Sequence, residues 1–152
     1  MLHEYAADMA GPLFTRIREE LGLAYQVGAT QFHGYDTGMF TFYLATSPEQ
    51  LDLAREEMIK EIATIAAHGI PDAAFDRVRA TALSGLALRQ QSPSHAARQM
   101  AIDLLFDLPA DHYRKMPDII RSLTPTHVRS VAEKLFSVTP SVAVVLPDDS
   151  AS

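Results

Sequence analysis

Three pairs of a helix-capping residue followed by proline divide this chain into helical segments, and they restrict its fold more than any other feature. The pairs are Ser-Pro at 47–48, Ser-Pro at 92–93 and Thr-Pro at 124–125. A hydroxyl at the N-cap accepts a hydrogen bond from the first helical turn, and proline suits the first helical position because it has no N–H to lose. Residues 47–50 (Ser-Pro-Glu-Gln) also have the form of a capping box. Most of the chain after residue 47 is therefore predicted to be helical.

Apolar side chains at spacings of three and four predict which face of each helix is buried. A further helix is predicted from Pro71, and a short one between Pro109 and Leu123. The side chains predicted to face the core include Leu51, Ala54, Met58, Ile62 and Ile65 after the first pair, Ala97, Met100, Ala101, Leu104 and Leu105 after the second, and Val128, Val131 and Leu135 after the third.

A helix over residues 11–21 is predicted ahead of these segments. Leu13 and Ile17 would share its buried face, with Arg16 turned toward water. Gly22 follows at the C′ position, where a left-handed backbone conformation closes a helix.

Three strands complete the expected fold. Residues 23–32 and 38–46 alternate in side-chain character, and the loop 33–37 between them predicts an antiparallel hairpin. The apolar, β-branched run at 141–146 is typical of a strand covered on both faces. We therefore expect an α+β fold, a small and mainly antiparallel sheet packed against several helices. It would form a single domain over residues 1–147, with a polar tail at 148–152.

Charge and composition exclude several classes of function. The formal net charge of −6 leaves no excess of basic residues to neutralise phosphates or anionic lipid, so nucleic acid and membranes are not expected partners. The chain has no cysteine, which excludes disulfides and thiolate chemistry. Residues 1–11 lack the basic and apolar regions of a signal peptide, and among compartments the cytoplasm is favoured.

A complete catalytic or metal site is not found in the sequence. The six histidines are too far apart for the paired ligands of a zinc-binding helix. Ser84 lies within a predicted helix and lacks the glycine-flanked turn of a serine nucleophile. Glycine-rich phosphate loops are also missing, so no cofactor is expected in this chain.

Residues 13–25 (LFTRIREELGLAY) carry the one specific motif. The stretch resembles the signature at the start of the substrate-binding half of insulinase/pitrilysin-like zinc peptidases, a family that includes the mitochondrial processing peptidases. The match is Leu-Phe-x-x-aliphatic-Arg-Glu-x-x-Gly-Leu-Ala-Tyr, and weaker similarity in the same order continues to residue 147. The resemblance implies part of a lobe of the LuxS/processing-peptidase-like metallohydrolase fold, with the usual first strand and helix of that lobe missing here.

The resemblance also implies a role for two residues. Arg18 and Tyr25 would be the arginine and tyrosine that the second lobe contributes to a cleft closed over an extended peptide. A zinc-bearing lobe, with its metal on a His-x-x-Glu-His helix, would be the partner and would complete the site. Arginine can hold substrate carbonyls, and a tyrosine hydroxyl can donate to the oxyanion of the transition state.

Two departures from the pattern leave alternatives open. Gly11-Pro12 stands where the family commonly has Ser-Arg, and Glu20 stands where it commonly has a basic residue. These changes would also suit a non-catalytic scaffold or peptide-binding subunit of the same family. An unrelated α+β interaction domain is a third reading. Because part of the usual sheet would be missing, we further expect uncovered apolar surface and self-association into a homo-oligomer.

Overall fold

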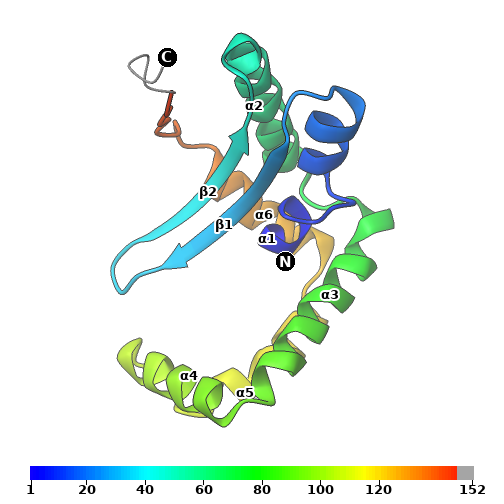
Figure 1. Cartoon of the computed structure of the whole chain (residues 1–152). Coiled ribbons are helices and arrows are strands. Elements are labelled where there is room, and N and C mark those ends of the chain that lie inside the picture. The colour runs from blue at the N-terminus through cyan, green and yellow to red at the C-terminus, as the bar shows by residue number, and fades with distance from the viewer. Residues whose placement is uncertain (147–152) are drawn as a thin grey trace.

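The computed structural model describes residues 1–146, and it combines one β-hairpin with a layer of helices (Figure 1). The predicted α+β class is confirmed. In chain order the elements are α1 (Leu2–Ala6), the π-helix η1 (Phe14–Glu20), β1 (Gln26–His33), β2 (Gly38–Ala45), the 3₁₀ turn η2 (Pro48–Gln50), α2 (Leu51–His68), α3 (Asp72–Gln90), α4 (Pro93–Leu105), α5 (His112–Ser122) and α6 (Pro125–Phe136).

The two strands pair antiparallel from Gln26 opposite Ala45 to His33 opposite Gly38. This register places Ala29 across from Phe42 on the face that packs into the core. Both predicted strands are confirmed. β1 begins three residues later and ends one residue later than predicted, and β2 begins at the predicted residue and ends one residue earlier. The opposite face of the hairpin is solvent-exposed and carries three large apolar or aromatic side chains, Phe32, Met39 and Tyr43.

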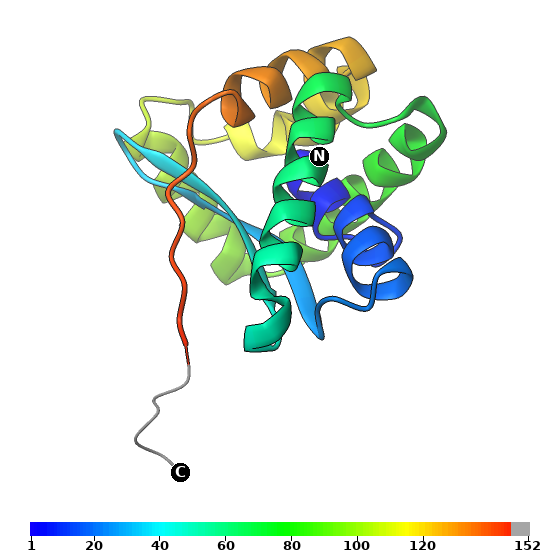
Figure 2. The ribbon, with the colours of Figure 1, turned by 90° about the horizontal axis from the view of Figure 1, so that it is seen from above.

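Helices α2 and α6 form the layer behind the hairpin (Figure 2). The ring of Phe136, at the end of α6, lies edge-on to Phe40 and Phe42 of β2 with centroids 5.1 and 5.3 Å apart. Ala54 and Ile65 of α2 are buried in the same cluster. One hydrophobic core therefore joins the hairpin to both helices.

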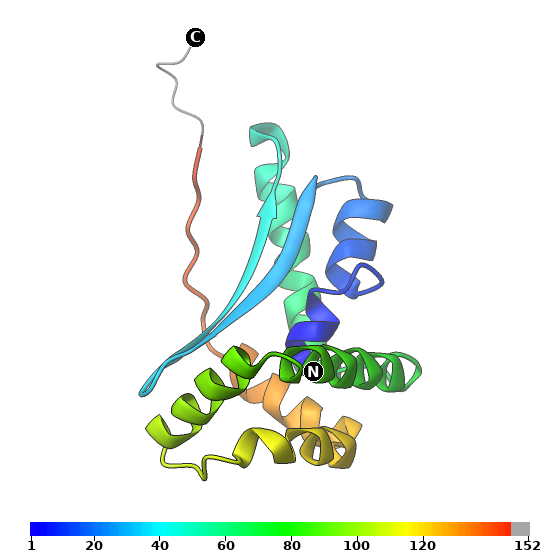
Figure 3. The same ribbon diagram turned by 60° about the horizontal axis from the view of Figure 1, so that its bottom comes forward.

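Helices α3, α4 and α5 form an arm that leads away from this core and returns to it (Figure 3). Asp103, only 3% exposed, holds the turn between α4 and α5. Its carboxylate accepts a hydrogen bond from the backbone N–H of Tyr113 at 2.9 Å and another from Gln99 at 3.1 Å. The side chain thus satisfies a buried donor in the first turn of α5.

Replacing Asp103 by alanine is expected to destabilise the fold by about 1–3 kcal/mol, because the buried N–H of Tyr113 loses its acceptor. Chemical denaturation of the wild type and the variant measures this difference. Asp118→Ala, on the exposed side of α5, is the matched control and should leave stability unchanged. Equal losses in the two variants would contradict the role assigned to Asp103.

The prediction of a third strand over residues 141–146 is wrong. These residues have no regular secondary structure, and Figure 3 shows them passing on the β2 side of the hairpin without joining the sheet. Val145 is 95% exposed. An apolar β-branched run favours an extended backbone, but a strand also needs a partner, and among residues 1–146 only β1 and β2 pair. The predicted tail at 148–152, together with Pro147, lies outside the described residues.

The predicted buried face of α4 is wrong, and that of α6 is wrong in part. All five side chains predicted to be buried in α4 are exposed: Met100 is 39% exposed, Leu104 and Leu105 are each 60% exposed, and Ala97 and Ala101 are exposed as well. In α6, Val128 is buried as predicted, whereas Val131 and Leu135 are exposed. Periodicity identifies an apolar face but not whether another element covers it. These side chains leave apolar surface open to solvent, and self-association remains a prediction.

The caps and the N-terminal region differ from expectation as well. Ser47 makes no side-chain cap, because the chain enters α2 through the tighter turn η2. Instead, Thr124 forms a capping box with His127 at the start of α6. The sequence pattern did not predict α1, whose Tyr5 and Ala6 are buried in the core.

Candidate functional site

The helix carrying the family motif is a π-helix rather than the α-helix expected over 11–21. Its wider turn appears in the hydrogen bond from Leu21 N–H to Arg16 C=O at 3.1 Å, five residues back. Leu13 and Ile17 are fully buried and fix the segment to the core. Single π turns of this kind often occur at functional sites.

Gly22 closes η1 in the left-handed conformation that the sequence predicts, with φ of 61°. The chain then turns back, and Leu23 N–H donates to Ile17 C=O at 2.9 Å. Thr46, at the end of β2, donates from its hydroxyl to Leu23 C=O at 2.6 Å. These bonds hold the backbone between η1 and β1 close to the end of β2.

The turn brings Arg18 and Tyr25 together. The Arg18 guanidinium carbon lies 5.5 Å from the centre of the Tyr25 ring and 4.8 Å from that of Phe14, so the cation stacks against both rings. Both Arg18 and Tyr25 are exposed, and the exposed fraction of Tyr25 is 85%. Neither side chain is buried in the interior.

An open cleft of about 330 Å³ lies beside Tyr25, between the start of β1 and the start of α2. Its walls come from two short segments of chain, Gly22, Leu23, Ala24 and Tyr25 on one side, and Ala45, Thr46, Ser47 and Gln50 on the other. Tyr25, Thr46, Ser47 and Gln50 contribute polar side chains to this lining. The cleft can therefore receive a peptide and hydrogen-bond to it.

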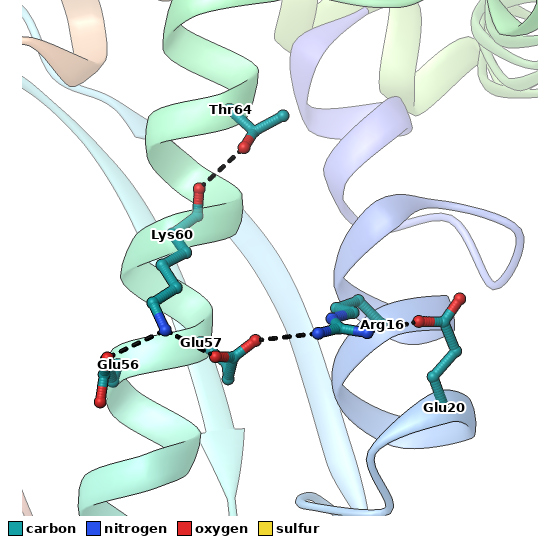
Figure 4. Close-up of polar contacts among 6 residues, drawn as sticks. All are labelled: Arg16, Glu20, Glu56, Glu57, Lys60 and Thr64. Atoms are coloured by element: carbon teal, nitrogen blue, oxygen red, sulfur yellow. Dashed lines mark hydrogen bonds and ion pairs between the residues drawn. The ribbon is translucent and has the colours of Figure 1, made fainter.

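Behind the cleft, an ion-pair network ties η1 to α2 (Figure 4). Arg16 contacts Glu20 at 2.8 Å within its own helix and Glu57 of α2 at 3.5 Å. Lys60 contacts the other carboxylate oxygen of Glu57 at 2.8 Å, and it also contacts Glu56 at 2.9 Å. Arg16 therefore pairs with α2, whereas the sequence predicts that it faces water alone. The spacing of residues along α2 gives no sign of a partner on η1.

Two acids near Arg16 have pKa values shifted in opposite directions, Glu57 by the network and Glu61 by burial. The hydrogen bond from Lys60 lowers the pKa of the Glu57 carboxyl, and the charge of Arg16 adds to this effect. Partial burial raises the pKa of Glu61, one turn further along α2, although the charge of Arg16 opposes that shift.

Glu61→Gln is expected to raise Tm at pH 7 by about 1–2 °C at most, since solvent screens this partly exposed group. The pKa of Glu61 is higher in the folded chain than in the unfolded chain. Its contribution to folding stability therefore becomes less favourable as the pH rises from the unfolded pKa to the folded pKa. The advantage of the variant should therefore vanish below about pH 4. Thermal unfolding from pH 3.5 to 8 measures this, and a difference that stays constant with pH would contradict it.

Residues 1–146 hold no group of three or more histidine, aspartate or glutamate side chains placed to bind a metal ion.

Among the same residues, no helix is both long enough and apolar enough to cross a bilayer.

Comparison with known proteins gives a family and several relatives. A family model described as the peptidase M16 inactive domain matches residues 1–82, just over half of the 152 residues. A Rickettsia bellii protein named as an uncharacterized zinc protease is 26% identical over 145 residues, which cover 95% of this chain and 35% of the relative. YmxG of Bacillus subtilis, named likewise, is 27% identical over 144 residues, with coverage of 92% and 34%. The chain thus spans about a third of the length of these relatives.

Solved structures give the same fold. A protease from Helicobacter pylori superposes with a TM-score of 0.76 at 16% identity, over 88% of this chain and 32% of the other. An inactive peptidase domain from Bordetella parapertussis superposes with a TM-score of 0.75 at 15% identity, over 88% of this chain and 73% of the other. These structures show the fold alone. Because the family model matches more than half of the chain, the chain belongs to the family of peptidase M16 inactive domains, which confirms the resemblance to insulinase/pitrilysin-like zinc peptidases carried by residues 13–25.

Proposed function

We propose that this chain is the substrate-binding, non-zinc lobe of an M16 metalloendopeptidase. The observation that carries the proposal is the contact between two exposed side chains, Tyr25, which lines the open cleft between β1 and α2, and Arg18, which stacks on the Tyr25 ring. Membership of the inactive-domain family and the zinc-protease names of the relatives support the same assignment.

Arg18 is suited to hold the backbone of a peptide. Stacking on Phe14 and Tyr25 fixes the plane of the guanidinium but uses its faces, not its N–H edges. Within residues 1–146 the Arg18 side chain makes no hydrogen bond or ion pair, so those donors are available for substrate carbonyls. Because the stack already orders the Arg18 side chain, less conformational entropy is lost when a peptide binds.

Tyr25 is suited to stabilise the transition state of peptide hydrolysis. Its phenol is exposed at the edge of the cleft, where the hydroxyl can donate to an oxyanion that develops on a bound carbonyl. Thr46, Ser47 and Gln50 line the same cleft, so their polar side chains can hydrogen-bond a peptide bound beside Tyr25.

In this proposal, a second lobe supplies the zinc that activates the attacking water. The described residues offer no metal cluster, so we assign the zinc to a partner lobe that carries a His-x-x-Glu-His helix. The relatives, about three times as long as this chain, have room for such a lobe in the same polypeptide. Neither lobe is expected to hydrolyse peptides alone.

Reconstitution tests this function. The chain is mixed with the zinc-bearing M16 lobe encoded in the same genome, and cleavage of a fluorogenic peptide of mid length is followed. We expect turnover only when both lobes and zinc are present. Peptide binding without any turnover would favour the alternative, a non-catalytic peptide-binding subunit, whereas neither binding nor turnover would reject the proposal.

A further inference from the structure

We propose that Glu57 is a positioning residue, which holds η1 against α2 through Arg16 and so places Arg18 over the ring of Tyr25. This inference rests on the proposed function for its consequence in catalysis, although its structural part can be tested without substrate or partner. Its basis is the path Glu57–Arg16–η1–Arg18, in which the first link joins two elements far apart in the sequence.

Glu57 is well placed to act as a fixed anchor. Its side chain is only 12% exposed, and its two oxygens face different cations, Lys60 at 2.8 Å and Arg16 at 3.5 Å. Figure 4 shows the Glu57 and Arg16 side chains reaching toward each other across the space between α2 and η1. A carboxylate held on both sides has little freedom to follow a moving helix, so it sets where Arg16 can lie.

Arg16 transmits this constraint within a single turn. It lies two residues before Arg18, and its second contact, to Glu20 at 2.8 Å, spans most of η1. A π-helix has poorer intrinsic stability than an α-helix, so contacts made by its side chains matter more for its shape. Buried Ile17 fixes the depth of the helix in the core. The ion pair between Arg16 and Glu57 then limits rotation of η1 about Ile17.

Rotation of η1 would separate Arg18 from Tyr25, whereas Phe14 is part of η1 and would move with Arg18. The stack on Tyr25 joins η1 to the start of β1, and the guanidinium is already 5.5 Å from the ring centre, near the limit of a useful cation–π contact. A small shift of the helix would therefore release Arg18 from the rim of the cleft while the core beneath stays packed.

The test compares Glu57→Gln with Glu56→Gln in the full chain. Glu56 is the matched control, since it is the neighbouring acid on α2 and contacts Lys60 but not Arg16. The first readout is the NMR resonance of the Arg18 side-chain N–H, which the ring currents of Tyr25 and Phe14 shift. We expect Glu57→Gln to move this resonance toward that of an unstacked arginine, and Glu56→Gln to leave it in place.

The second readout is kcat/KM of the reconstituted peptidase. We expect Glu57→Gln to lower it about fivefold, since a partly exposed ion pair contributes modestly, while Glu56→Gln has no effect. Arg16→Gln removes the more exposed member of the same ion pair, so it should reproduce both changes. It serves as the second variant if Glu57→Gln does not fold.

Three outcomes would overturn the inference: an unmoved Arg18 resonance in the Glu57 and Arg16 variants, an equal shift in Glu56→Gln, or an undiminished rate in an active assembly. If the wild-type assembly shows no turnover, the proposed function fails. The resonance alone then decides whether Glu57 positions Arg18.

Discussion

Replacing Tyr25 by phenylalanine is expected to lower kcat of the reconstituted peptidase about 100-fold, because one oxyanion donor is lost in a site that depends on few of them. KM should change little, since the hydroxyl is assigned to the transition state and the ring that stacks on Arg18 is retained. Steady-state kinetics with one peptide measures both constants.

The fold should be unaffected by this change, because Tyr25 is almost fully exposed. Tyr43→Phe provides the matched control: it removes the hydroxyl of another exposed tyrosine, on β2 and outside the lining of the cleft. We expect this control to cleave at the wild-type rate. A rise in KM with unchanged kcat in Tyr25→Phe would assign the hydroxyl to ground-state binding instead.

Replacing Ile17 by alanine is expected to destabilise the chain by about 2–5 kcal/mol, the range for a fully buried aliphatic side chain that leaves a cavity. Ile17 has no exposed surface and joins η1 to the central core. For a chain of this size the loss should lower Tm by about 5–15 °C. Differential scanning calorimetry measures it.

Leu88→Ala serves as the comparison for this prediction. Leu88 lies on α3 and is two-thirds exposed, so its removal should leave Tm unchanged. Similar losses in the two variants would mean that η1 is not anchored through Ile17, and the rigid base required for Arg18 would be missing.

The hairpin and most helices could be predicted from the sequence because their signals are local. Alternation of side chains identified β1 and β2, and the pairs at 92–93 and 124–125 fixed the starts of α4 and α6. Gly22 was likewise predicted from a local requirement, a positive φ after the last turn of a helix. Each of these features depends on neighbours within a few residues.

The errors concern features set by distant parts of the chain. Residues 141–146 have the composition of a strand but no pairing partner among the residues described, and the apolar face of α4 has no element over it. The π-helical form of η1 also escaped prediction, since apolar spacing cannot distinguish a π turn from an α turn over seven residues.

For the candidate site, Arg18 and Tyr25 were identified only through the motif, and the structure brings the two side chains together. The residues behind them, Arg16 and Glu57, are 41 positions apart, and no sequence pattern linked them. Motifs can thus identify groups that face a substrate, while the contacts that orient those groups become visible only in three dimensions.

The most direct test of the account is kcat/KM of the reconstituted peptidase with Arg18→Ala, Tyr25→Phe and the double variant. Each single change is expected to slow cleavage strongly, and the double variant should be slower than either, because Arg18 is assigned to substrate carbonyls and the Tyr25 hydroxyl to the oxyanion. Wild-type rates in both single variants would contradict the account.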